Sequence, residues 1–137
     1  MEEKANMYGH RRMVVWQNLD RIEELVQLEI LKQIPKNCFQ LRDQIDRSCS
    51  SSVANFIEGY YSGSIKEYLR FLSYSKRSLA ELQDWVRRVF HKSFISKEKY
   101  LKFDDLSIKT IYLLNRLMNA LEIKSLHSLK PSKPQKP

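Results

Sequence analysis

The sequence predicts an all-α protein, an antiparallel up-and-down four-helix bundle, and two observations lead to this fold class. Four segments carry apolar residues at steps of three and four, which places these residues on one face of a helix. Three of the four prolines lie in the last seven residues, so nothing between Pro35 and Pro131 forces a helix to break at proline. With 137 residues the chain forms one domain with a buried core, and four long amphipathic helices pack most simply as a bundle.

The first helix is expected over residues 10–34, after a frayed segment at residues 1–9. Its apolar face consists of Met13, Trp16, Leu19, Ile22, Val26 and Ile30. Pro35 ends the helix, and Lys32 lies in its last turn, where a cation is favourable.

The second helix is expected over residues 38–59, with Asn37 as its N-cap and Gln40 as the return partner. The small residues at positions 49–54 lie inside its apolar stripe and would allow another helix backbone to approach closely. Gly59 or Gly63 would supply the positive φ that ends the helix.

The third helix is expected over residues 64–92, because Ser64 and Glu67 form the S-x-x-E capping box. Phe71, Trp85 and Phe90 widen its apolar surface beyond one stripe. We therefore expect this helix to contact more than one neighbour, including a second copy of the chain.

The fourth helix is expected over residues 96–126, with Ser96 as its N-cap and Glu98 in its first turn. The bundle would then span residues 10–128. Residues 129–137 form a basic, proline-rich tail that is expected to be disordered.

Charge is distributed unevenly along the chain. The net charge is +8, and residues 1–86 contribute none of it, because their 12 Lys and Arg balance 12 Asp and Glu. Such asymmetry suggests a polyanionic partner, either nucleic acid or an anionic membrane surface. A solvated basic face that only aids solubility is the alternative.

The location expected from the sequence is the cytoplasm. No segment reaches the roughly 18 apolar residues that a membrane span requires, and the N-terminus lacks the apolar core of a signal peptide. Cys38 and Cys49 are far apart on one predicted helix, so a disulfide between them is not expected. No membrane association is predicted.

Basic residues gather around the third loop and continue along the fourth helix. The predicted nucleic-acid contacts are Arg87, Arg88, His91, Lys92, Lys97, Lys99, Lys102, Lys109, Arg116 and Lys124. Lys and Arg contacts to phosphates give affinity that does not depend on sequence and falls with salt. Tyr60, Tyr61, Phe94 and Tyr100 could stack on unpaired bases, but their spacing favours packing instead.

A polar group lies at the junction of the second and third helices. It comprises Asn55, Glu58, Gly59, Ser64, Glu67 and Arg70. A carboxylate beside an apolar stripe must be paired to be buried, so we interpret this group as a structural clasp between the two helices. A ligand or RNA contact at Asn55 and Glu58 is the alternative.

No catalytic residues, cofactor or metal site are predicted. His10, His91 and His127 are dispersed, and the sequence has no Gly-rich phosphate loop, Glu-x-x-His pair or nucleophile elbow. The protein is therefore expected not to be an enzyme.

Six short motifs resemble those of a known family. They are Trp16-Gln17, Ile34-Pro35, Leu41-x-x-Gln44-Ile45-x-Arg47, Asn55-Phe56-Ile57-Glu58-Gly59, Ser64-x-Lys66-Glu67-Tyr68-x-Arg70-Phe71-Leu72 and Ser78-Leu79-Ala80-Glu81-Leu82. With these motifs in this order, the sequence resembles the four-helix-bundle proteins encoded in bacterial 23S rRNA intervening sequences. The same family includes the accessory variability protein of diversity-generating retroelements. The resemblance implies a homopentameric barrel with a basic surface.

The resemblance also implies a function. It implies an RNA-binding accessory protein, acting either in the intervening-sequence branch or beside a reverse transcriptase in the retroelement branch. The family's basic residues after the N-x-x-E-G motif are replaced here by Tyr61, Ser62 and Gly63, which argues against an anion contact at that turn. The charge distribution places the expected anion contacts at the third loop and the fourth helix. The alternative is a protein-interaction scaffold whose basic face binds an acidic protein.

Overall fold

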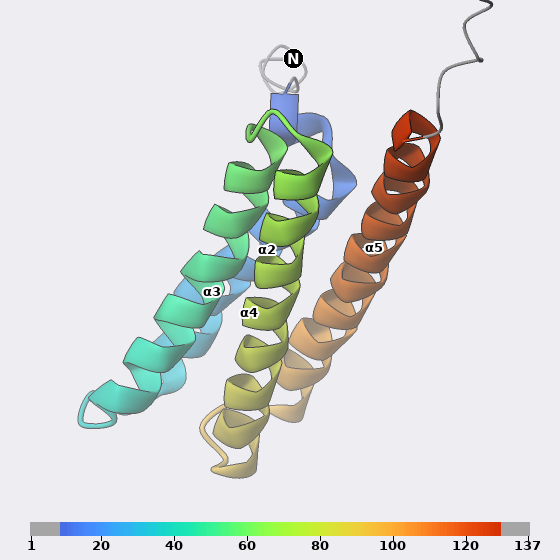
Figure 1. Ribbon diagram of the computed structural model, residues 1–137. Coiled ribbons are helices and arrows are strands. Elements are labelled where there is room, and N and C mark those ends of the chain that lie inside the picture. Colours follow the sequence, from blue (N-terminus) through green and yellow to red (C-terminus); the bar gives the residue numbers. More distant parts are fainter. Residues whose placement is uncertain (1–8, 130–137) are drawn as a thin grey trace, which may run out of the picture.

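The computed structural model describes residues 9–129, and the predictions made for residues 1–8 and 130–137 lie outside this part. The described chain contains helices and no strand, and its four helical segments run alternately up and down, side by side (Figure 1). The predicted all-α four-helix bundle is therefore confirmed. No helix in residues 9–129 combines the length and apolarity that crossing a bilayer requires.

The sequence predicted one continuous α-helix over residues 10–34, but the first segment is divided into four parts. It consists of the 3-10 helix η1 (Gly9–Arg12), the α-helix α2 (Val14–Leu25), the π-helical turn η2 (Val26–Ile30) and the 3-10 helix η3 (Leu31–Gln33). In η2 the backbone widens, and the N–H of Leu31 bonds to the carbonyl oxygen of Val26, five residues earlier. Val26 and Ile30 remain fully buried across this change.

Helix α3 (Phe39–Tyr60) begins without the predicted side-chain cap. Cys38 is the N-cap residue, and its N–H bonds to the carbonyl oxygen of Pro35 at 3.0 Å. This turn leaves Asn37 outside the capping position, so the expected cap formed by Asn37 and Gln40 is wrong.

Helix α4 (Ile65–His91) packs closely on α3 through small residues. The hydroxyl of Ser75 donates to the carbonyl oxygen of Ser52 at 2.6 Å, and the hydroxyls of Ser51 and Ser78 lie 2.8 Å apart. A Cβ added at Gly59 would lie 2.9 Å from the Cβ of Phe71. The serine-rich part of α3 is thus a helix–helix contact and not a linker.

The N-terminus of α4 is capped as the sequence predicted. The N–H of Glu67 donates to the hydroxyl oxygen of Ser64 at 3.1 Å. The carboxylate of Glu67 pairs with Arg70 at 2.6 Å, so the return half of the capping box is replaced by an ion pair. Gly63, with φ of +84°, forms the turn between α3 and α4.

Helix α5 (Lys97–Leu129) begins at the predicted cap, where the N–H of Lys99 donates to the hydroxyl of Ser96 at 3.2 Å. Its buried side chains are Phe103, Ser107, Thr110 and Leu114. After Leu114 the residues facing the bundle are only half-buried. The C-terminal part of α5 therefore contributes less to the core than its apolar sequence allows.

Candidate nucleic-acid interface

Two loops lie at the same end of the bundle. The η3–α3 loop and the α4–α5 loop both lie at the lower end in Figure 1, because alternate loops of an up-and-down bundle share an end. Lys32 belongs to η3 and Lys36 to the loop that follows it, and both are exposed. Neither lysine was among the predicted contacts, although the predicted topology alone would have placed both at the same end of the bundle as the third loop.

We call the basic side chains at this end the loop-end cluster. Its members are Lys32, Lys36, Arg87, Arg88, His91, Lys92, Lys97 and Lys99. All are exposed except Lys99, which is half-buried. The ion pairs found within the described residues engage only Arg87 and Arg88 of this cluster. The remaining basic side chains of the cluster are available to an anionic ligand.

Asp84 organises the two arginines of the cluster. Its carboxylate lies 2.9 Å from a guanidinium nitrogen of Arg87 and 2.9 Å from one of Arg88. The hydrogen bond from Arg87, together with the charge of both arginines, lowers the pKa of Asp84 below its ordinary value. Two guanidinium groups thus share one carboxylate, so Asp84, Arg87 and Arg88 together keep a net positive charge.

The α4–α5 loop is held tightly. Ser93 adopts a φ of 63°, and the N–H of Phe94 bonds to the carbonyl oxygen of Val89 at 3.1 Å, as in a Schellman motif. The rings of Phe90 and Tyr100 stack with centroids 4.5 Å apart and planes 1° apart. Tyr100 is thus packed against α4, which matches the favoured interpretation of this residue.

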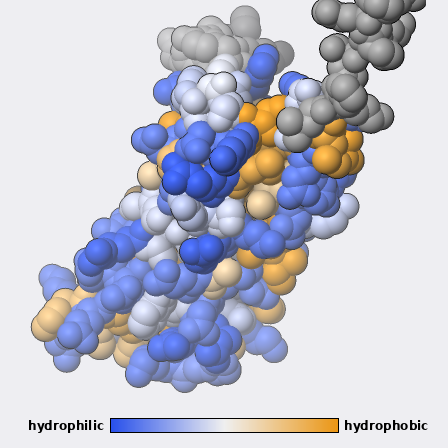
Figure 2. Space-filling model, viewed as in Figure 1, coloured by the Kyte–Doolittle hydropathy of each residue, from blue (hydrophilic) through white to orange (hydrophobic). Residues whose placement is uncertain are grey.

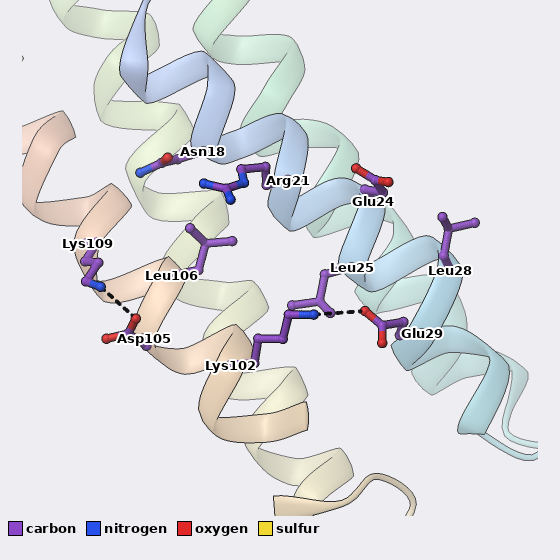
Figure 3. A pocket seen from close by; sticks show the side chains of 10 residues that line it. All are labelled: Asn18, Arg21, Glu24, Leu25, Leu28, Glu29, Lys102, Asp105, Leu106 and Lys109. Atoms are coloured by element: carbon purple, nitrogen blue, oxygen red, sulfur yellow. Dashed lines mark ion pairs between the residues drawn. The ribbon is translucent and has the colours of Figure 1, made fainter. Parts of the chain in front are cut away.

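Two predicted contacts, Lys102 and Lys109, are engaged in a mixed-charge groove between α2–η2 and α5. Lys102 reaches across to Glu29 at 3.6 Å, while Lys109 pairs with Asp105 on its own helix at 2.9 Å (Figure 3). Arg21 and Glu24 also line this groove. Positive and negative side chains balance here, so this groove offers no cationic surface.

Arg116 and Lys124 extend along α5, away from the loop end. Both are exposed, and the guanidinium of Arg116 lies 5.9 Å from the centre of the Tyr112 ring. The structure thus divides the predicted contacts into one group at the loop end and a second group spread along α5.

The predicted clasp is only partly present. Glu58 is exposed and has no hydrogen bond or ion pair among the described residues, so the argument from a buried carboxylate does not apply to it. The side-chain amide of Asn55 donates to the carbonyl oxygen of Ser51, within α3, at 2.8 Å. The helices are instead joined by the close contact at Gly59 and by the serines described above.

Tyr60 and Tyr61 lie at the opposite end of the bundle from the loop-end cluster, at the α3–α4 turn. The ring of His10 contacts Tyr60 and Tyr61, with centroids 6.4 Å and 5.6 Å away. Nδ1 of His10 lies 2.9 Å from the hydroxyl oxygen of Tyr61. These aromatic side chains connect η1 to the end of α3.

A further groove of about 600 Å³ opens beside the loop-end cluster. It lies between the first turns of α3 and the last turns of α4, and its lining residues are Gln40, Leu41, Asp43, Gln44, Trp85, Arg88 and Lys92. The guanidinium of Arg88 lies 4.7 Å from the centre of the Trp85 ring. The groove combines an aromatic surface, amide side chains and two cations.

Within residues 9–129, His, Cys, Asp and Glu side chains form no group of three that could hold a metal ion. Cys49 is buried, and burial raises the pKa of its thiol to about 12. This thiol is therefore protonated at neutral pH and suits the core of the bundle.

The family model described as 23S rRNA-intervening sequence protein matches residues 11–116. The matched range includes the loop-end cluster and ends before Lys124. No curated protein matches the chain.

Proposed function

The chain belongs to the 23S rRNA-intervening sequence protein family, and on this premise we propose that it is a non-enzymatic, oligomeric RNA-binding accessory protein. The observation that carries the proposal is the loop-end cluster. Two loops that are distant in sequence, together with the helix ends beside them, carry eight basic side chains at one end of the bundle, and six of these have no ion pair within the described residues.

The cluster suits phosphate groups better than base edges. Exposed Lys side chains act as mobile point charges, which bind phosphate without selecting a sequence. Five phosphate contacts would lower the association constant for a single strand roughly hundredfold between 50 and 200 mM salt. RNA binding should therefore be strong at low salt and weak at high salt.

The family's name suggests the RNA to test, which is a fragment of 23S rRNA that contains the intervening sequence. The test variant combines Lys92→Glu with Lys97→Glu, and fluorescence anisotropy would report binding. We expect the affinity to fall at least tenfold, because two attractive contacts become repulsive.

A matched control carries the same change of net charge at the other end of the bundle. It combines Arg12→Glu with Lys66→Glu, both at exposed positions. This control should bind within about twofold of the wild type. Equal losses in both variants, or no binding at 50 mM salt, would contradict the proposed interface.

We also propose that the protein forms a homo-oligomer through α5. The helix exposes Leu101, Ile108, Tyr112, Ile123 and Leu126, each more than half accessible. Figure 2 shows hydrophobic surface over the C-terminal part of α5 and beside it toward α4. Phe71, Trp85 and Phe90, from which the sequence predicted a contact with a second copy, are each half-buried within the chain, so α5 offers the more exposed apolar side chains. The number five rests on the family resemblance alone.

Light scattering at micromolar concentration tests the oligomer. We expect a multiple of the chain mass for the wild type and a smaller species for Ile123→Lys combined with Leu126→Lys. A wild-type monomer at this concentration would refute the oligomer without bearing on RNA binding.

A protein-interaction scaffold is the second candidate function, and the same exposed α5 surface favours it. A protein that co-purifies with the chain after nuclease treatment, and that no longer does so with the Ile123→Lys/Leu126→Lys variant, would support the scaffold. Partnership with a reverse transcriptase stays a prediction from the resemblance, and co-purification with the enzyme would test it.

A further inference from the structure

We infer that the groove between α3 and α4 takes the base of an unpaired nucleotide, which stacks on the surface formed by Trp85 and Arg88. The inference rests on the proposed RNA binding and deepens it, because it adds base contacts to the phosphate contacts of the loop-end cluster. Three features of the groove carry it.

The first feature is an aromatic ring with a guanidinium group lying over it. Trp85 is half-buried, and its indole nitrogen donates to the carboxylate of Glu81 at 3.3 Å. The guanidinium of Arg88 lies over the ring at 4.7 Å, while its other contact, with Asp84, restrains its position. Aromatic rings and guanidinium planes are the surfaces on which proteins stack unpaired bases.

The second feature is a pair of amide side chains on the facing helix. Gln40 and Gln44 are one turn apart on α3, and neither side chain hydrogen-bonds to a described protein group. An amide offers a donor and an acceptor, the combination that pairs with the N6 and N7 atoms of adenine. Asp43 also lines the groove, although it pairs with Arg47 at 3.5 Å, and its carboxylate can accept from an exocyclic amino group.

The third feature is the position and size of the groove. Lys92 and Arg88 belong both to the groove and to the loop-end cluster, so a phosphate bound by the cluster carries its base toward Trp85. The volume of about 600 Å³ lies in the range of small-molecule sites. Together the three features favour an adenine nucleotide over a uracil nucleotide, which lacks the amino group.

The test uses the full chain with Trp16→Phe, so that Trp85 is the only tryptophan and its fluorescence reports the groove. The probes are AMP, an octamer of adenylate and an octamer of uridylate. We expect the adenylate octamer to quench Trp85 at lower concentration than the uridylate octamer. If AMP and the adenylate octamer quench Trp85 at similar concentrations, the ligand is a free nucleotide. If only the octamer quenches Trp85, the ligand is an RNA strand.

The decisive variant combines Gln40→Leu with Gln44→Leu, which removes the amides without changing the net charge. It should weaken the quenching by adenylate roughly fivefold or more, and Gln33→Leu at the same end should leave it unchanged. Trp85→Leu should lower the affinity for the adenylate octamer roughly fivefold or more, as measured by the anisotropy of a labelled octamer.

The outcomes separate this inference from the proposed function. Salt-sensitive RNA binding without a change in Trp85 emission, or with equal quenching in the Gln40→Leu/Gln44→Leu variant, overturns the inference and leaves the function standing. If RNA does not bind but AMP quenches Trp85 and the glutamine variant loses that effect, the proposed function fails while the groove remains a nucleotide site. No quenching by any probe overturns the groove as a nucleotide site.

Discussion

The guanidinium of Arg42 donates a hydrogen bond of 2.6 Å to the carbonyl oxygen of Leu31, where the first helical segment ends. The same nitrogen donates to the carbonyl oxygen of Ile34 at 3.0 Å. A helix end leaves carbonyl groups without partners, and here a side chain from the next helix supplies one. Arg42 therefore joins α3 to the irregular end of the first segment.

The first prediction is that Arg42→Met lowers the free energy of unfolding by about 1–3 kcal/mol, because methionine keeps the packing of the stem but donates no hydrogen bond. Urea unfolding would measure the loss. Arg47→Met is the control, since Arg47 makes only an exposed ion pair with Asp43, and it should cost about 0.5 kcal/mol or less. Equal costs would contradict the role assigned to Arg42.

The second prediction concerns Gly59, which is buried in α3 against α4. Alanine in a helix interior is normally more stable than glycine by about 0.5–1 kcal/mol. At Gly59, however, a Cβ would lie 2.9 Å from the Cβ of Phe71 and 3.3 Å from the carbonyl oxygen of Tyr68. Gly59→Ala should therefore destabilise the protein by about 1–3 kcal/mol. In urea unfolding, a stability equal to or above that of the wild type would show that the two helices can move apart freely.

The fold could be predicted because its signals are local. Apolar periodicity gave the four helical segments, and the caps at Ser64 and Ser96 are present as hydrogen bonds to Glu67 and Lys99. The π-helical turn at Val26–Ile30 could not be predicted, since its apolar spacing also fits an α-helix and no glycine or proline marks it. Its end is completed by Arg42, a tertiary contact that no local pattern reveals.

The candidate site could be predicted only in part from the sequence. The residue types were visible, but their partners depend on the fold: Lys102 meets Glu29, which belongs to a distant part of the chain. Lys32 and Lys36 join the loop-end cluster because the bundle places two loops at the same end, a step that the predicted topology already allowed. Helical periodicity places a side chain on a face, but it does not tell which charges are already paired.

The third prediction separates packing from binding at Tyr100, whose ring stacks on Phe90. Tyr100→Leu should lower the free energy of unfolding but leave the affinity for RNA unchanged. A double-mutant cycle with Phe90→Leu should give a coupling energy of about 0.5–1.5 kcal/mol. Reduced RNA affinity at unchanged stability would instead mean that Tyr100 stacks on a base.

The fourth prediction follows from the lowered pKa of Asp84. A carboxyl group with a depressed pKa stabilises the folded state above its unfolded pKa of about 4, and this contribution is lost as the pH falls through the folded pKa. Asp84→Asn should therefore be slightly less stable than the wild type from pH 5 to 7, with the difference vanishing in more acidic solution. Thermal unfolding of both proteins, from neutral pH down to pH values below the folded pKa of Asp84, would measure this difference in stability. The difference is small because the ion pairs of Asp84 are exposed.

The same substitution should act in the opposite direction on RNA. Asp84→Asn releases Arg87 and Arg88 from their shared carboxylate, so the affinity for RNA should rise and the salt slope should steepen by about one phosphate contact. Asp20→Asn changes the net charge equally at an exposed position on α2 and should have little effect on either quantity. If both variants raised the affinity alike, net charge and not the release of the two arginines would be responsible. A loss of stability together with a gain in affinity at Asp84, and not at Asp20, would identify Asp84 as a local restraint on the binding arginines.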